Sequence, residues 1–173
     1  SKEAAINNMD VIISTGDKDM AQLVDQNITL INTMNDEILD RDGVKQKFDV
    51  YPEQVIDYLT LMGDKADNIP GIPGVGAKTA SKWLNKYLTL ENLINNSDEI
   101  TGKIGEKLRA NLSLLPLSKK LVTIDQNLDL SLKSTDLKRA STDNEKLKSI
   151  YKELELKTFY SQISETKDEV PLK

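Results

Sequence analysis

Hydrophobic and polar positions divide the chain into a short β-rich beginning and a longer helical remainder. The apolar, β-branched run at 10–15 is typical of a buried strand. The alternation over 27–39 predicts a strand, a polar turn and a second short strand. From Pro52 onward, apolar residues recur at helical spacing. The expected fold is therefore mainly α with a small β portion.

The helical pattern predicts a series of helices, the first of which, at 2–9, is the end of a longer helix. Pro116 is expected to break the helix that starts near Ile100, because proline lacks the N–H donor, with 117–123 resuming it. Residues 125–132 are expected to be extended. Trp83 is expected to pack in the core, although a base-stacking role is the alternative. The expected helices are 2–9, 20–24, 40–48, 52–62, 78–87, 90–94, 100–115 and 147–154, the last of them amphipathic and of core type.

Two carboxylates three residues apart follow the helix predicted for 52–62. If helical geometry continues for one more turn, Asp64 and Asp67 lie on one side and can share an ion. Hard divalent cations prefer oxygen ligands of this kind. The alternative is that either aspartate caps a helix or closes an Asx-turn.

A second acidic pair stands just beyond the strand predicted at 10–15. Carboxylates at the carboxyl end of a strand are where α/β sheets place their active sites, so Asp17 and Asp19 are candidate metal ligands. The alternative for Asp17 is the cap of the helix that follows it.

A glycine-rich turn leads into the helix predicted for 78–87. Its glycines let an anion reach the amide N–H groups of 76–79, at a helix end that favours negative charge. Lysines four residues apart form one stripe along that helix, which suits a polyanion, and a threonine adds a hydroxyl donor. A solvated helix whose glycines serve only the turn is the alternative. The candidate DNA-binding residues are Gly74, Val75, Gly76, Lys78, Thr79, Lys82 and Lys86.

The stretch Leu61–Ala80, with Ser14–Val24 upstream, resembles the 5′–3′ exonuclease domain of bacterial DNA polymerase I, in the flap endonuclease superfamily. The likeness runs from the first residues to about Ile163. It implies a PIN-like nuclease sheet followed by a helical, helix-hairpin-like DNA-binding subdomain. It also implies a two-metal centre for Mg²⁺ or Mn²⁺ to which Asp17, Asp19, Asp64 and Asp67 contribute, and a K⁺ ion at the carbonyls of the glycine-rich turn, that of Val75 included.

The same resemblance gives the expected domain organisation. Residues 1–50 are the C-terminal part of the metal-dependent α/β core, 51–163 the helical subdomain, and 164–173 a linker to a polymerase domain. Further acids and a basic helical arch of the family have no match in this chain. We therefore expect it to bind duplex DNA with a 5′ flap or 5′ end weakly and not to cleave it. A non-catalytic DNA-binding module and a partner-binding domain are the alternatives.

Composition restricts the chemistry more than the class of partner. The chain has 173 residues and neither cysteine nor histidine, which excludes disulfides, thiolate chemistry and imidazole bases. The net charge of −5 does not exclude DNA, because one basic face can coexist with an acidic remainder. No apolar run approaches the roughly 18 residues that span a membrane, so no membrane partner and a cytoplasmic location are expected.

Overall fold

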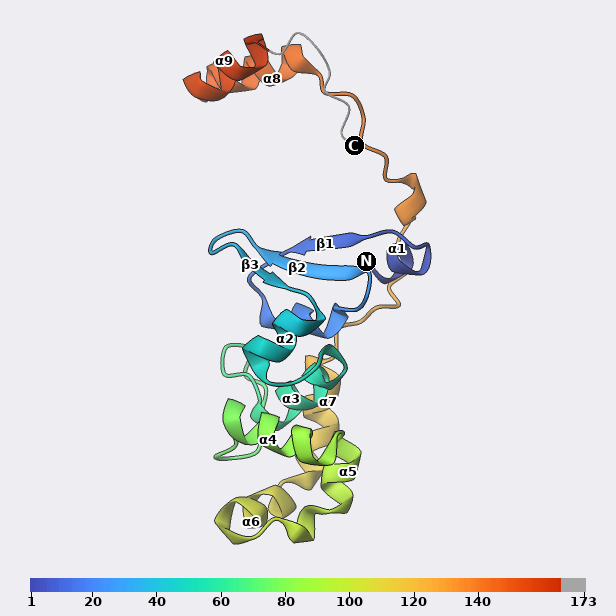
Figure 1. The fold of residues 1–173 in the computed structure, drawn as a ribbon, viewed down its shortest axis with the longest axis vertical. Coiled ribbons are helices and arrows are strands. Elements are labelled where there is room, and N and C mark those ends of the chain that lie inside the picture. Colours follow the sequence, from blue (N-terminus) through green and yellow to red (C-terminus); the bar gives the residue numbers. More distant parts are fainter. Residues whose placement is uncertain (166–173) are drawn as a thin grey trace. The chain divides into compact units, whose positions relative to one another are not determined.

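The computed structural model describes residues 1–165 and forms two compact units, Ser1–Thr135 and Asp136–Lys173 (Figure 1). The first unit contains a small sheet and a set of short helices, with the sheet at one end and α6 at the other (Figure 1). This is the mainly α fold with a small β portion that the sequence predicts. Most of the expected linker, residues 166–173, lies outside the described residues.

The sheet has three strands in the order β1 (Val11–Ser14), β2 (Ile28–Asn32) and β3 (Glu37–Leu39). β1 pairs with β2 in parallel, with Ile13 opposite Leu30, and β2 pairs with β3 antiparallel. The strand, polar turn and short strand expected over 27–39 are therefore confirmed.

β1 differs from its prediction in burial. Ile28 and Leu30 on β2 are at most 2% exposed, whereas Ile12 on β1 is 67% exposed. β1 is an edge strand, so it has a neighbour on one side only, and within residues 1–165 the face that carries Ile12 is open. The prediction of a strand at 10–15 is correct, and the prediction that it is buried is wrong.

The helices of the first unit pack around α3 (Figure 1), which contacts both α4 and α7. Their core includes Leu59, Leu84 and Leu115, each at most 2% exposed. Trp83 is 7% exposed, which confirms its predicted packing role. The α-helices are α1 (Lys2–Ile6), α2 (Arg41–Phe48), α3 (Val55–Met62), α4 (Ala77–Tyr87), α5 (Leu90–Asn95), α6 (Gly102–Ala110) and α7 (Leu115–Val122). The 3₁₀ turns are η1 (Lys18–Leu23), η2 (Pro52–Gln54), η3 (Ser97–Glu99), η4 (Leu112–Leu114) and η5 (Ser134–Asp136).

Pro116 does not break a helix, contrary to the prediction. α6 ends at Ala110, and Pro116 lies in the first turn of α7. The first turn of a helix has no acceptor for its N–H groups in any case, so proline is tolerated there. One long expected helix is thus two helices joined through η4.

Gln22 connects η1 to the C-terminal end of α7 and the residues after it. Its side chain is 9% exposed, its Nε2 donates to the carbonyl of Val122 at 2.9 Å, and its Oε1 accepts from the N–H of Ile124 at 3.0 Å. η1 is thereby attached to the end of α7, and the position of the aspartates beside Gln22 depends on that attachment.

The second unit contains α8 (Asn144–Glu153) and α9 (Lys157–Glu165), which pack against each other. The Tyr151 and Phe159 rings lie 5.6 Å apart between centroids. The amphipathic helix expected over 147–154 is present, but its core-type burial is wrong, since Ile150 remains 39% exposed. Among residues 1–165, no helix is both long and apolar enough to cross a bilayer.

Candidate metal centre

Asp64 and Asp67 are brought together by a tight loop, and not by the continued helix that their spacing suggested. α3 ends at Met62, and Gly63 has a φ of +72°, which turns the chain away from helical geometry. Asp64 and Ile69 then form a two-way backbone bridge, with N···O distances of 3.0 and 2.7 Å. The expectation of a further helical turn is wrong, but the two carboxylates converge.

Asp64 also closes an Asx-turn, the alternative that the sequence left open. Its Oδ1 accepts from the N–H groups of Ala66 at 2.7 Å and Asp67 at 3.4 Å. The residue is 6% exposed, so these bonds fix a buried carboxylate inside the loop. Its second oxygen, Oδ2, is left for a cation.

Asp17 and Asp19 lie at the start of η1, directly after β1. Asp17 caps the turn, because its Oδ1 accepts from the N–H of Asp19 at 3.0 Å. Asp19 Oδ1 is buried and has no hydrogen-bond partner among the described residues. An unpaired buried carboxylate oxygen is costly and therefore indicates a group that an ion or water satisfies.

Three of the four predicted ligands form one cluster. Asp19, Asp64 and Asp67 each offer a carboxylate oxygen, and these oxygens lie within 4.8 Å of one another. Asp17 is outside that group and exposed. An all-oxygen set with an unpaired buried acceptor fits a hard divalent cation such as Mg²⁺ or Mn²⁺.

Lys18 is the residue of this site that sequence reasoning missed. It forms an ion pair with Asp64 Oδ2, and this hydrogen bond lowers the pKa of Asp64 and raises that of Lys18. Burial, and then the neighbouring Asp17 carboxylate, raise the pKa of Asp19. The position of Lys18 between two aspartates in the sequence is the only local signal, and it does not reveal a partner 46 residues away.

The glycine-rich turn continues from the acidic loop. Gly71 packs directly on α3, where a Cβ would lie 2.3 Å from the carbonyl carbon and oxygen of Met62. Gly74 has a φ of +87°, a conformation that side chains disfavour. Ile72 and Val75 are buried and anchor the turn. Gly71 and Gly74 are therefore required by the structure of the turn itself.

The turn leaves the start of α4 open. Gly76 is the N-cap residue of the helix and has no side chain that could accept from the first turn. Its carbonyl accepts from the N–H groups of Thr79 and Ala80 at 3.0 Å. Within the described part of the chain, the N–H groups of Ala77 and Lys78 have no acceptor. The amides that remain available to an anion are thus fewer than the 76–79 set predicted.

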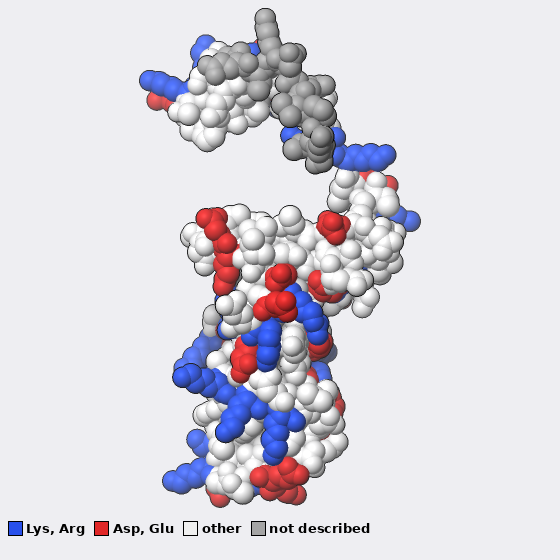
Figure 2. Space-filling model, viewed as in Figure 1, with Lys and Arg blue, Asp and Glu red and all other residues white. Residues whose placement is uncertain are grey.

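The lysines around the turn differ in their partners. Lys78 and Lys82 are exposed and have no acidic partner in residues 1–165, whereas Lys86 pairs with Glu99 at 3.4 Å. Lys107 of α6 lies beside the turn, with its Nζ 3.4 Å from where a Cβ on Gly74 would be. Figure 2 shows acidic and basic side chains intermixed in the middle of the first unit, basic ones gathered directly below them, and a further acidic group at the helical end.

One groove of about 790 Å³ extends from Asp64 to the glycine-rich turn. Lys18 and the segment 62–66, which includes Asp64, line one part of it, and the continuous segment 69–76 lines the other. Of the four predicted metal ligands, Asp64 is the one that shares this groove with the glycine-rich turn.

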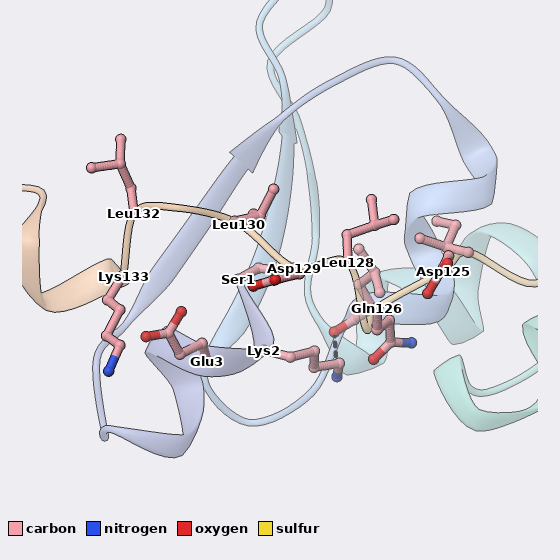
Figure 3. Close-up of a pocket in the computed structure, with 12 residues that line it drawn as sticks. Ser1, Lys2, Glu3, Asp125, Gln126, Leu128, Asp129, Leu130, Leu132 and Lys133 are labelled. Carbon is pink, nitrogen blue, oxygen red and sulfur yellow. Dashed lines mark hydrogen bonds between the residues drawn. The ribbon is translucent and has the colours of Figure 1, made fainter.

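A second groove, of about 410 Å³, lies between α1 and the extended segment 124–133 (Figure 3). Leu128, Leu130 and Leu132 lie on one side of that segment, and each is at least 60% exposed. None of the predicted metal or DNA-binding residues lines this groove, so it is separate from the candidate centre.

The comparisons with known proteins agree on one family. Residues 50–145 match the family model described as "5′-3′ exonuclease, C-terminal SAM fold". The chain is 43% identical over 153 residues to the 5′-3′ exonuclease of Aquifex aeolicus. This alignment covers 88% of the chain and 52% of that relative. It is 42% identical over 171 residues to DNA polymerase I of Pseudomonas aeruginosa, covering 94% of this chain and 19% of the polymerase.

Solved structures support the fold. The 5′-exonuclease of phage T5 with bound divalent metal ions (zinc) superposes with a TM-score of 0.64 at 23% identity, over 70% of this chain and 45% of that one. The T5 flap endonuclease in a pseudo-enzyme-product complex with DNA and metal ions superposes with a TM-score of 0.64 at 20% identity. This superposition covers 95% of this chain and 55% of that one. The chain spans about half the length of the Aquifex relative that it matches.

Proposed function

The chain belongs to the 5′–3′ exonuclease family, and from that premise we propose that it is part of a metal-dependent nuclease that hydrolyses DNA phosphodiesters at or near a 5′ end. The observation that carries this proposal is the groove lined by Lys18 and Asp64 on one part and by Ile69–Gly76 on the other. A duplex backbone held at the turn would thus run toward Asp64 and the Asp19 and Asp67 carboxylates beside it. Primer removal and repair are the processes that such an activity would serve.

We assign the metal-binding role to Asp19, Asp64 and Asp67, with Asp17 as a further ligand. The cluster within 4.8 Å and the Asp19 oxygen that has no hydrogen-bond partner among the described residues support this assignment for the first three. Asp17 positions Asp19 through the hydrogen bond to its N–H. Two bound Mg²⁺ or Mn²⁺ ions would activate a water and stabilise the leaving oxygen of the phosphodiester. Because no histidine or cysteine is present, this chain's own contribution is carboxylates and lysines.

We assign the DNA-binding role to the turn and the surface beside it. The N–H groups of Ala77 and Lys78 suit a phosphate oxygen, and the ammonium groups of Lys78 and Lys82, which have no acidic partner among residues 1–165, extend that contact along α4. Lys107, beside Gly74, widens the same surface. Such contacts read the backbone and not the bases, so binding is sequence-independent. A K⁺ ion at the turn's carbonyls, including that of Val75, belongs to the same proposal.

The proposal concerns a chain that spans about half of one relative and 19% of another. The preference for a 5′ flap and the presence of a following polymerase domain, as in the relatives named DNA polymerase I, are parts of it. We expect this chain alone to bind DNA weakly and not to cleave it. Cleavage of a 5′-flap substrate in Mg²⁺ that is lost in the Asp64→Ala, Asp67→Ala double variant would contradict that expectation.

The test is a fluorescence-anisotropy titration against a 5′-flap duplex over a range of salt. We expect log affinity to fall linearly with log salt at a slope of about −2 to −4. Replacing Lys78 and Lys82 with Gln should reduce that slope by about 2 and weaken binding up to about 100-fold at 0.1 M salt, since each phosphate contact contributes about 0.9 to the slope.

The matched control changes the same number of charges elsewhere. Lys146 and Lys152 on α8 are exposed and have no acidic partner in the part of the chain that is described. Their double replacement with Gln should leave affinity within about threefold of the parent. Equal losses in both double variants would mean that total charge, and not the turn, determines binding, and would overturn the proposal.

A further inference from the structure

Asp64 has no free oxygen in this structure. Its Oδ1 accepts from the backbone N–H groups of Ala66 and Asp67, and its Oδ2 is paired with the ammonium of Lys18. The loop fixes the Oδ1 contacts, because Asp64 and Ile69 are joined by the backbone bridge. A metal ion that coordinates Asp64 must therefore take Oδ2, the oxygen that Lys18 already occupies.

Lys18 is placed so that it can leave. Its side chain is 40% exposed, whereas that of Asp64 is 6% exposed, so the ammonium covers the carboxylate from the solvent side. Lys18 also lines the groove that leads to the glycine-rich turn. Moving the ammonium into this groove requires rotation of a flexible side chain and no change of backbone.

We propose that Lys18 is the internal counter-cation of the acidic site and sets its metal affinity by competing with the divalent ion for Asp64 Oδ2. This inference rests on the proposed function. In the absence of metal, Lys18 reduces the repulsion among Asp19, Asp64 and Asp67. When the ion binds, the ammonium is released at the wall of the groove, where the phosphate backbone of the substrate is its next anionic partner.

The decisive experiment measures Mn²⁺ binding by the chain, with the free ion quantified from the electron paramagnetic resonance signal of aqueous Mn²⁺. Lys18→Met keeps the length of the side chain and removes its charge. We expect this variant to bind Mn²⁺ about tenfold more tightly, because it loses a competing cation in direct contact with a ligand oxygen.

Lys65→Met is the matched control. Lys65 is exposed, lies next to Asp64 in sequence and lines the same groove, but has no ion-pair partner among residues 1–165. Its removal should strengthen Mn²⁺ binding by about threefold or less, the effect of a nearby charge in water. Equal gains in the two variants would mean that only the general field matters and would overturn the inference.

Failure of the inference and failure of the proposed function give different results. If wild type binds Mn²⁺ and Lys18→Met binds it equally or more weakly, Lys18 does not compete and the inference alone is wrong. If neither protein shows Mn²⁺ binding that Asp64→Asn abolishes, the metal site itself is wrong, and the inference falls with it.

A measurement on wild type avoids dependence on the variant's folding. The amine of Lys18 is acetylated by a water-soluble ester, and the extent is followed by mass spectrometry with and without Mn²⁺. Release from Asp64 should speed acetylation of Lys18 about threefold or more when Mn²⁺ is present, as expected for the loss of an ion pair. Lys146 serves as the internal reference, and an unchanged ratio of Lys18 to Lys146 labelling would overturn the inference.

Discussion

The acidic site and the glycine-rich turn border the same groove, but their charges are arranged differently. In the acidic site, the buried Asp64 has a partner for both of its oxygens, one of them the ammonium of Lys18. At the turn, Lys78 and Lys82 have no acidic partner within residues 1–165. The acidic site must exchange a cation to bind a metal, whereas the turn can accept an anion directly. We therefore expect DNA binding to need no rearrangement and metal binding to be competitive.

The largest effect is expected at Gly71, where the two regions are joined. Gly71→Ala would bring a Cβ to 2.3 Å from the carbonyl of Met62, so either α3 or the turn must shift. We expect a loss of about 3 kcal/mol or more in the free energy of unfolding, measured by urea denaturation.

Gly16→Ala is the control for Gly71→Ala. A Cβ on Gly16 would meet Asn32 Nδ2 at 3.5 Å, which is an ordinary contact. Its effect should stay below about 1 kcal/mol in either direction. If the two variants unfold at the same urea concentration, the close packing of the turn on α3 does not hold the two regions together.

An effect of intermediate size is expected when either of two carboxylates of the acidic site is neutralised, and the two changes in stability should have opposite signs. The Lys18 hydrogen bond lowers the pKa of Asp64, so Asp64→Asn should destabilise the metal-free protein at neutral pH by about 1–2 kcal/mol. Burial and Asp17 raise the pKa of Asp19, so Asp19→Asn should stabilise it by about 0.5 kcal/mol. Thermal unfolding in a chelator measures both.

The pH dependence follows from the same signs. The contribution of Asp64 is present above its unfolded-state pKa of 3.8 and is lost as pH falls through the lower folded-state value. The difference between wild type and Asp64→Asn should therefore shrink in acid. A shift of both variants in the same direction at neutral pH would contradict the opposite electrostatic environments of the two residues.

The smallest effect is expected from Lys86, although it continues the lysine stripe of α4. Lys86 pairs with Glu99 and donates to the Tyr87 hydroxyl at 2.8 Å, so its charge is already offset. Lys86→Gln should weaken binding to the flap duplex by about twofold or less, against about tenfold for Lys82→Gln at 0.1 M salt. Comparable losses in the anisotropy titration would place Lys86 on the DNA-binding surface, as the helical spacing alone predicts.

Local patterns predicted the elements well and their surroundings less well. The alternation over 27–39 and the spacing from Val55 to Met62 gave β2, β3 and α3, because these signals depend on neighbouring residues. The burial of Ile12 was wrong, because burial depends on what else packs against an edge strand. The prediction that Pro116 breaks a helix was wrong. Proline also favours the first turn of a helix, and Pro116 lies in the first turn of α7.

For the site, the sequence predicted the residues but not the way in which they meet. Asp64 and Asp67 converge through a loop that follows the positive φ of Gly63, and not through a helical turn. The pairing of Lys18 with Asp64 joins η1 to a loop beyond α3, and no local pattern reports such a contact. The metal and DNA roles of all these residues stay predictions.

The hydrogen bonds of Gln22 have a consequence for the order in which the protein folds. They connect residues 100 and 102 positions apart, and long-range contacts form slowly because a large loop must close first. The contacts of the turn between α3 and α4 are closer in sequence, since Ile72 N–H donates to the carbonyl of Leu61 and the Ser118 hydroxyl of α7 donates to that of Pro70, 48 positions away. We therefore expect a refolding chain to complete the glycine-rich turn before its acidic site, so that DNA affinity returns before metal affinity.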